Sequence, residues 1–187
     1  MPIENEENVT IREANAAYAT ELARLRWESR EEDQANHSEA DFLRECEVWI
    51  QEALASRRWI MAVAESRPGV LLGCMFLQSV EKVPVPGGRR RAWGYITNSF
   101  VRLEQRRHGI GQKLLRFLIE AAQNSGFEFL IVWPSEAAVR FYQREGFLPV
   151  ARVHLGPDVP VSLLVLRRTA RPLHCVSTPP IWRPHVP

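Results

Sequence analysis

A glycine-containing turn between a predicted strand and a predicted helix constrains this chain more than any other segment. The turn follows the apolar run 93–101, precedes an amphipathic helix over 114–122, and consists of Arg106, Arg107, His108, Gly109, Ile110 and Gly111. Two glycines two apart allow a tight turn in which several N–H groups point at one spot. The helix N-terminus adds unpaired N–H donors and a positive dipole end. The turn therefore predicts a pocket for a phosphate or pyrophosphate.

Basic side chains around the turn favour the same ligand. Arg106, Arg107 and Lys113 would add charge-assisted hydrogen bonds to an anion. A hexamer of this pattern also arises by chance in about one chain in five of this length. The alternative interpretation is an ordinary glycine-assisted turn into a helix, with the arginines solvated.

A second segment makes the pattern more specific. Residues 133–147, WPSEAAVRFYQREGF, predict a strand end, a short helix and a Gly-Phe stop. Together the two segments resemble the acetyl-CoA-dependent N-acetyltransferases of the GNAT superfamily. The first matches the pyrophosphate loop of that family. The second matches its Asn-x-x-Ala-x-x-[Leu/Phe]-Tyr-x-x-x-Gly-Phe signature, with Ser135 in the asparagine position. The resemblance covers about residues 8 to 170 and is strongest from 93 to 147.

Composition suits one domain over residues 1–170, followed by a proline-rich tail over 171–187. Hydrophobic residues make up 45% of the chain, which is enough for one core. The 24 basic and 22 acidic residues give no reason to expect a nucleic-acid-binding face. The three cysteines suit neither a disulfide framework nor a zinc site, and the histidines show no metal-ligand spacing. No apolar run approaches the ~20 residues that span a bilayer, so we expect a cytoplasmic protein without a membrane or metal partner.

Periodicity and turn signals predict the order β-α-α-β-β-β-α-β-α-β-β. The expected strands are 8–14, 59–64, 70–80, 93–101, 127–133, 150–154 and 161–166. The expected helices are 15–30, 38–56, the helix after the glycine turn, which ends near 126, and 135–145. Such an order gives an α/β (α+β) fold with a mixed sheet and helices on both faces. The resemblance further implies a mostly antiparallel sheet and a splayed central strand pair that holds the pantetheine arm of an acyl-CoA.

For the donor site, the resemblance implies acetyl-CoA as co-substrate and no metal. Main-chain groups of Phe100, Val101 and Arg102 would bind the pantetheine amides, unless they only pair within the sheet. Gln112 and Lys113 would add pyrophosphate contacts. Ser135 can cap the helix that follows it, but it lacks the reach of the family's asparagine toward coenzyme A.

For catalysis, Tyr142 matches the family tyrosine that protonates the departing thiolate. The alternative is a helix-face aromatic with its hydroxyl at the surface. The strand before the glycine turn carries no carboxylate that could act as a base. Strict alternation places Ile96, Asn98 and Phe100 on one face, which by analogy looks toward the acyl group. Asn98 would then orient a substrate or a water, or serve as a hydrogen-bonded core asparagine.

The first two predicted helices would recognise the acceptor. They supply charged and aromatic side chains, namely Arg26, Trp27, Glu28, Arg30, Glu31, Glu45 and Trp49. We expect Trp27, Glu28 and Glu31 to contact the substrate, since acidic groups attract an amine and tryptophans form an aromatic wall; solvated helix charges are the alternative. The leading hypothesis is acetyl transfer to a primary amine of a small molecule. Another acyl-CoA, a hydroxyl acceptor and a non-catalytic acyl-CoA sensor stay open, as does a homodimer.

Overall fold

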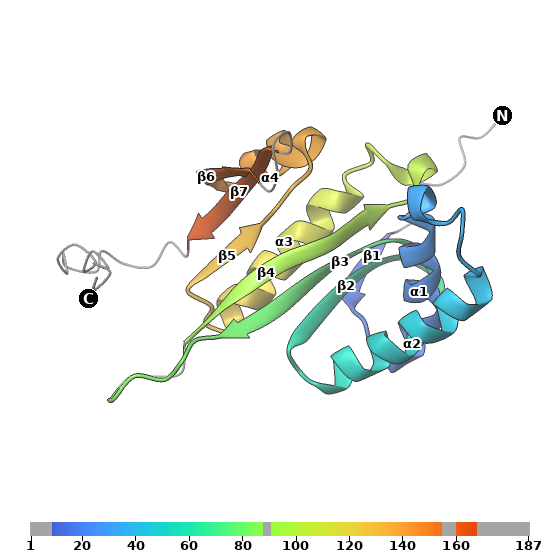
Figure 1. Cartoon of the computed structure of the whole chain (residues 1–187), viewed down its shortest axis with the longest axis horizontal. Helices are drawn as coiled ribbons and strands as arrows, with labels where there is room; N and C mark the ends of the chain where they lie inside the picture. Colours follow the sequence, from blue (N-terminus) through green and yellow to red (C-terminus); the bar gives the residue numbers. More distant parts are fainter. Residues whose placement is uncertain (1–8, 88–90, 155–159, 168–187) are drawn as a thin grey trace, which may run out of the picture.

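The computed structural model describes residues 9–87, 91–154 and 160–167, and these form one sheet flanked by helices (Figure 1). The strand order in the sheet is β1-β2-β3-β4-β5-β7-β6, and only β4 and β5 run parallel. The strands are β1 Thr10–Glu13, β2 Trp59–Arg67, β3 Val70–Glu81, β4 Ala92–Val101, β5 Phe129–Val132, β6 Leu148–His154 and β7 Pro160–Arg167. The predicted order, the mixed sheet and its mostly antiparallel pairing are thereby confirmed.

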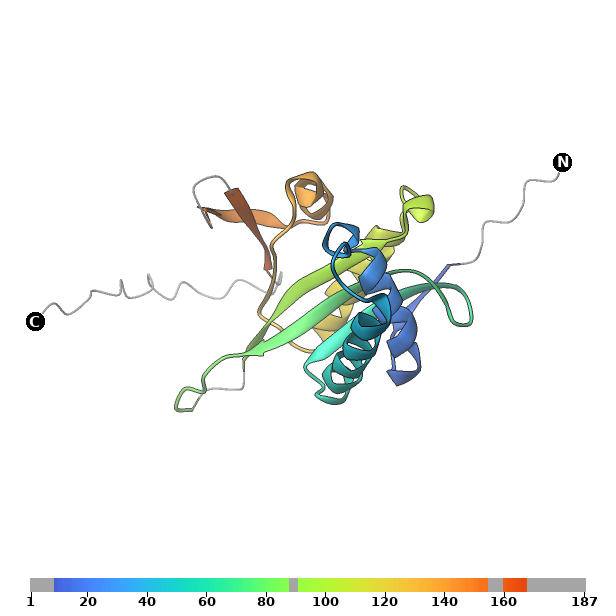
Figure 2. The ribbon, with the colours of Figure 1, turned by 45° about the vertical axis from the view of Figure 1, so that its right-hand side comes forward.

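The helices cover both faces of the sheet, as expected. α1 (Ala19–Glu28) and α2 (Glu39–Ala55) lie side by side on one face, and α3 (Ile110–Asn124) packs on the other (Figures 1 and 2). α4 (Val139–Arg144) lies in the connection between β5 and β6. The predicted helix 15–30 begins with a 3-10 turn, Ala16–Tyr18, and the predicted helix 135–145 begins with another, Glu136–Ala138.

Local sequence signals fix the ends of α2 and α3. Ser38 caps α2, because its hydroxyl accepts from the Asp41 N–H at 3.4 Å. Gly109 precedes α3 in the left-handed region with φ 76°, which only glycine adopts without cost. Ser135, by contrast, makes no side-chain cap to the helical turn that follows it, so the expected cap is absent.

Two apolar clusters hold the helices on the sheet. On the α3 face the fully buried leucines Leu114, Leu115 and Leu118 pack with Ile96 and Tyr142. On the other face Leu22, Leu25 and Ile50 pack with Met61 and Phe76. Each buried side chain of this size stabilises the fold by about 1.5–3 kcal/mol. β4 therefore lies between two well-packed layers.

The parallel pair β4–β5 separates after three residue pairs. The last pair is Ile96 with Val132, after which β4 continues to Val101 while β5 ends. Pro134, two residues after the end of β5, has no N–H to extend the pairing. Within the described part of the chain, the edge of β4 that faces β5 thus has no strand partner over residues 97–101, which confirms the predicted splay.

A β-bulge at Asn98 overturns the strict alternation expected along β4. Cys74 pairs with Phe100 but Phe76 pairs with Thr97, so β4 has one extra residue there, and Asn98 has φ 48°. Asparagine tolerates this left-handed conformation better than most residues do.

The bulge changes which face each side chain takes. Ile96 packs in the α3 cluster, whereas Phe100 packs against the α1–α2 cluster and Asn98 hydrogen-bonds to α1. Ile96 therefore does not share a face with Asn98 and Phe100, and that prediction is wrong.

Several sequence-based expectations fall outside the described part of the chain. These are a turn expected around 156–158, the proline-rich tail 171–187 and one of the three cysteines, Cys175. The domain boundary near 170 stays a prediction. Within the described residues, none of the helices combines the length and the hydropathy of a membrane span.

We predict that Gly73→Ala destabilises the fold by about 1–3 kcal/mol, as overpacking does. Gly73 pairs with Val101 beside the bulge, and an added Cβ would lie 2.6 Å from the Phe100 carbonyl oxygen. Chemical denaturation measures the change. Gly111→Ala is the control, because its Cβ would meet the Phe141 ring at an ordinary 3.6 Å. Equal stability of both variants would contradict the close approach of β3 to β4.

Candidate functional site

The glycine turn and the first turn of α3 border a cavity of about 330 Å³, which we call the phosphate cavity. It is lined by Val101, Gln105, Arg106, Arg107, Gly109, Ile110, Gly111, Gln112, Phe141, Arg144 and Glu145. Six predicted loop residues are thus brought together there. His108 and Lys113 are exposed and do not line this cavity.

The backbone of the turn leaves N–H groups free for an anion. Arg107 and Gly109 both adopt left-handed φ values, 68° and 76°. The N–H of Lys113 makes the first α-helical bond, to the Gly109 carbonyl at 3.0 Å. The N–H groups of residues 110–112 therefore have no carbonyl one turn back. This arrangement, at the positive end of a helix of 15 residues, fits a phosphate group.

The charges around the phosphate cavity favour an anion. The Arg106 side chain donates from Nε to the Val101 carbonyl at 2.9 Å, which ties the turn to the end of β4. Glu145 is the acidic residue of the lining, and it accepts from Arg116 at 2.9 Å and from Gln112 at 2.5 Å. The hydrogen bond from Arg116 lowers the pKa of Glu145. Its negative charge is thereby compensated by groups of the protein.

The end of β4 keeps its pairing with β3 while its other edge is open. The Arg102 N–H donates to the Leu72 carbonyl at 2.9 Å. The Arg102 side chain binds Glu28 of α1 through two hydrogen bonds of 2.8 and 2.9 Å. Phe100 thus lies on an edge that can bind amides, whereas the Val101 carbonyl already accepts from Arg106 and the Arg102 guanidinium is bound to Glu28.

Tyr142 reaches across the splay to β4. Its side chain is only 3% exposed, and its hydroxyl oxygen lies 2.8 Å from the Ser99 hydroxyl oxygen. Burial raises the pKa of Tyr142, although the hydrogen bond with Ser99 acts in the opposite direction. The alternative of a surface hydroxyl is therefore excluded. Ser99 was missed as a site residue because strict alternation placed it on the face opposite Ile96, away from the expected acyl group; the asparagine at the bulge was the available signal.

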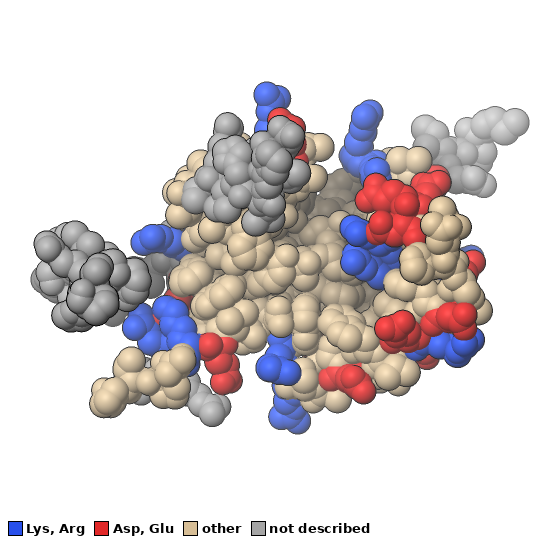
Figure 3. Space-filling view, in the orientation of Figure 1, with Lys and Arg blue, Asp and Glu red and all other residues tan. Residues whose placement is uncertain are grey.

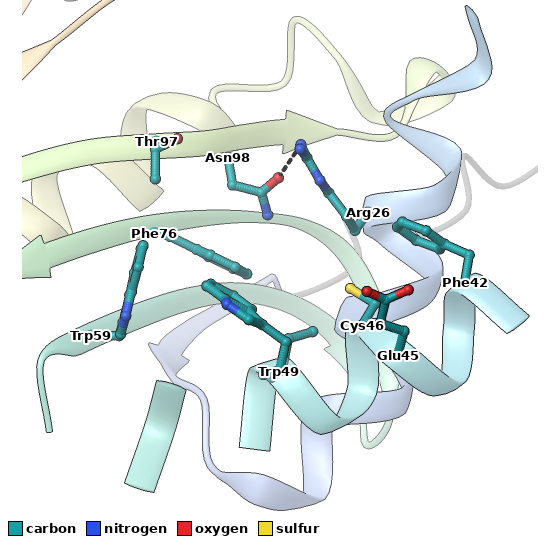
Figure 4. Close-up of a pocket in the computed structure, with 10 residues that line it drawn as sticks. Arg26, Phe42, Glu45, Cys46, Trp49, Trp59, Phe76, Thr97 and Asn98 are labelled. Atoms are coloured by element: carbon teal, nitrogen blue, oxygen red, sulfur yellow. Dashed lines mark hydrogen bonds between the residues drawn. The ribbon is translucent and has the colours of Figure 1, made fainter. Parts of the chain in front are cut away.

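Asn98 is bound on both ends of its amide. Its Oδ1 accepts from Arg26 Nη1 at 2.9 Å (Figure 4). Its Nδ2 lies 3.8 Å from the buried Cys74 sulfur. Asn98 is thus hydrogen-bonded inside the protein and also lines cavities, while its orienting of a substrate or a water stays a prediction. Its clear effect is to position the Arg26 guanidinium.

A second cavity, the polar cavity, lies between the end of α1 and β4 and measures about 610 Å³. Its lining includes Glu28, Glu31, Glu32, Arg26 and Arg106. Figure 3 shows the acidic and arginine side chains gathered around a hollow there. Of the predicted substrate residues, Glu28 and Glu31 lie in this lining. Trp27 lines neither this cavity nor the phosphate cavity. Its ring packs against the Phe42 ring, with the ring centroids 5.3 Å apart.

A third cavity, the aromatic cavity, measures about 390 Å³ and lies beneath α2 (Figure 4). It is lined by Arg26, Phe42, Glu45, Cys46, Trp49, Ile50, Trp59, Phe76, Thr97 and Asn98. Trp59 and Phe76 come from β2 and β3, so nothing in the local sequence pattern grouped them with the site.

The three cavities follow one another along β4. The phosphate and polar cavities share Arg106, and the polar and aromatic cavities share Arg26, Thr97 and Asn98. A ligand anchored at the glycine turn can therefore extend toward the bulge and meet a second molecule there. Over 9–87, 91–154 and 160–167 no group of three or more His, Cys, Asp or Glu is placed to hold a metal ion.

Comparison with known proteins identifies this arrangement. Residues 19–147 match the model of the acetyltransferase (GNAT) family. No curated protein sequence matches the chain.

Solved structures share the fold. A predicted acetyltransferase from Clostridium acetobutylicum, solved with acetyl-CoA, has a TM-score of 0.63 and is 19% identical over 79% of this chain and 96% of its own. An acetyltransferase of the GNAT family from Streptococcus pneumoniae has a TM-score of 0.64 and is 24% identical over 86% of this chain and 99% of its own. Arabidopsis thaliana NAA60 in complex with acetyl-CoA has a TM-score of 0.65 and is 16% identical over 87% of this chain and 100% of its own. The chain belongs to the acetyltransferase (GNAT) family.

Proposed function

We propose that this protein transfers the acetyl group of acetyl-CoA to a primary amine of a small molecule. The observation that carries the proposal is the Tyr142–Ser99 pair across the open edge of β4, between the phosphate cavity and the acceptor-side cavities. Solved neighbours from Clostridium acetobutylicum and Arabidopsis thaliana that contain acetyl-CoA support the choice of donor.

The donor side fits the two polar parts of acetyl-CoA. The free N–H groups of residues 110–112, with Arg107 beside them, would hold the pyrophosphate. The open edge of β4 over residues 97–101 would bind the pantetheine amides as a further strand would. The thioester supplies an activated acyl group next to Ser99 and Tyr142.

The chemistry needs a proton donor for sulfur and an acceptor for the proton of the amine. The amine nitrogen forms a bond to the carbonyl carbon, and the C–S bond breaks as the thiolate takes a proton from the Tyr142 hydroxyl. We assign acceptance of the amine's proton, directly or through water, to Glu45. It is the carboxylate that lines the aromatic cavity, whereas Glu28 is bound to Arg102. Glu45 then releases the amine's proton to solvent, and the Tyr142 phenolate takes one proton back from solvent, so the protons balance.

The amino group of a polypeptide is a second candidate acceptor. The observation that favours it is the polar cavity, whose borders carry the exposed side chains of Glu31 and Glu32 and leave room for a longer chain. Two further alternatives are another acyl-CoA as donor and a hydroxyl group as acceptor. A turnover assay that compares several acyl-CoA donors, and amines with alcohols as acceptors, distinguishes them from acetyl transfer to an amine. A cytoplasmic location and a homodimer stay predictions.

We predict that Gly109→Asp weakens acetyl-CoA binding tenfold or more, about 1.4 kcal/mol. The new carboxylate would face the pyrophosphate at the start of α3. Gly109→Asn is the matched control, since both residues tolerate the left-handed backbone and only one adds charge. Isothermal calorimetry measures both affinities. Absence of binding by the unaltered protein would refute the donor assignment.

We predict that Tyr142→Phe lowers kcat about 10²-fold or more, the usual effect of losing a general acid. The affinity for acetyl-CoA should stay within about threefold, because the lost hydroxyl bonds to Ser99 and not to the phosphate cavity. Release of free thiol from acetyl-CoA measures turnover, and Tyr95→Phe, on β4, serves as control. Unchanged kcat in Tyr142→Phe would remove Tyr142 from the mechanism.

We predict that the Tyr142 phenol titrates above the ordinary tyrosine pKa of about 10, because burial disfavours the phenolate. The raised pKa keeps the proton on Tyr142 at neutral and mildly alkaline pH, and this donor is lost only as pH rises through the raised value. The difference between tyrosinate absorbance curves of the unaltered protein and Tyr142→Phe isolates this group. A midpoint at or below about 10 would contradict the effect of burial.

A further inference from the structure

The aromatic cavity has walls suited to a planar apolar group. Trp49 and Trp59 meet edge to face with centroids 5.2 Å apart, and Trp59 meets Phe76 in the same way at 6.5 Å. Phe42 closes the end near α1 (Figure 4). Trp49 is 44% exposed, so the cavity opens beside it. A volume of about 390 Å³ lies within the range of small-molecule sites, and aromatic walls favour a further ring.

Arg26 gives this cavity a binding group for an anion. Its side chain is half-buried, and its one hydrogen bond in the described part of the chain goes from Nη1 to Asn98 Oδ1. No carboxylate of the described residues lies within ion-pair distance of Arg26, whereas Arg12, Arg102 and Arg116 each have one. The guanidinium has five N–H donors, so most remain available for a carboxylate.

The position of Arg26 determines where the amine of a ligand would lie once its carboxylate is bound. Arg26 and Asn98 line both the aromatic and the polar cavity, and Ser99, the partner of Tyr142, follows Asn98 directly. In an α-amino acid one carbon atom separates the amine nitrogen from the carboxylate carbon. A carboxylate on Arg26 would therefore place the α-amine beside the bulge, with the side chain directed into the aromatic cavity. An amine without a carboxylate would leave Arg26 half-buried and unpaired, which is unfavourable.

We propose that the acceptor is a free α-amino acid with an aromatic or large apolar side chain, with Arg26 binding its carboxylate and the aromatic cavity its side chain. This inference rests on the proposed acetyl transfer. The product is the N-acetyl amino acid: the acetyl C–S bond breaks, the C–N bond forms, the sulfur gains a proton and the nitrogen loses one.

The first experiment compares acceptors in the thiol-release assay. Phenylalanine and tryptophan are tested beside phenylalaninamide, phenethylamine, glycine, and a dipeptide that begins with phenylalanine. We expect kcat/KM for phenylalanine to exceed that for its amide and for phenethylamine at least tenfold. Equal or faster turnover of the amide, the amine or the dipeptide would overturn the proposal while leaving acetyl transfer intact. If acetyl-CoA binds and none of the amines is acetylated, the proposed function itself fails.

The second experiment tests Arg26 through the acid-to-amide preference. In Arg26→Gln, KM for phenylalanine should rise tenfold or more, while KM for phenylalaninamide stays within about threefold. Arg26→Lys should restore part of the preference, because it keeps the charge without the planar fork. Arg24→Gln is the control, since Arg24 lies on the same helix, is 55% exposed and pairs with Glu21. A preference that persists in Arg26→Gln would refute the role of Arg26.

The third experiment tests the aromatic wall. Trp49→Ala should raise KM for tryptophan several-fold and leave KM for glycine unchanged, because only the large side chain reaches the wall. Val48→Ala, at the exposed neighbouring position of α2, is the control. Equal effects of Trp49→Ala on tryptophan and glycine would contradict binding of the side chain in this cavity. The acid-to-amide comparison in the unaltered protein decides the proposal even if a variant does not fold.

Discussion

The β-bulge at Asn98 is the constraint on which the rest of the site depends. One extra residue in β4 turns Asn98 toward α1 and Ser99 toward Tyr142, which reverses the faces that strict alternation from Ile96 would give these two residues. With strict alternation from the buried Ile96, Asn98 would face α3 and Ser99 would face α1. The bulge lies directly after the last β4–β5 pair, so the open edge and the reset alternation occur together. The donor and acceptor halves of the site meet at this point.

Polar contacts hold α1 against β4 where the apolar cluster ends. Arg102 binds Glu28 through two hydrogen bonds, and Arg26, two residues earlier in the helix, binds Asn98. The pair Arg102–Glu28 is partly exposed, so its contribution to stability is at most about 1 kcal/mol. Its more specific effect is geometric, because it fixes the end of the helix that carries Arg26. A change in either contact would therefore move the acceptor side relative to Tyr142 without disturbing the core.

The donor side could be predicted from the sequence because it depends on backbone geometry. Gly109 marks a left-handed turn, the apolar periodicity after it marks α3, and Tyr142 lies at a fixed place in a short motif. Each of these signals is local. The element order and the mixed sheet followed from the same local patterns.

The acceptor side could not be predicted in the same way, because its walls come from distant segments. Trp59 and Phe76 lie on different strands, and Arg26 and Trp49 lie on different helices. Only the sheet register and the packing of α2 bring them together. Glu28 was expected to attract an amine, but Arg102, which is far away in the sequence, occupies it. The bulge escaped detection for a related reason, since an extra residue in a strand does not change its composition.

Cys74 illustrates how burial keeps a thiol unreactive beside the proposed acetyl-transfer site. Its thiol lies beside Asn98 and could in principle take an acyl group, but only a thiolate is an effective nucleophile. Complete burial raises the pKa of Cys74 to about 12, so the thiol stays protonated at neutral pH. The sulfur then acts only as a weak hydrogen-bonding partner of the Asn98 amide. Burial in the cluster on the α3 face likewise raises the pKa of Tyr142, so the phenol, like the Cys74 thiol, keeps its proton at neutral pH.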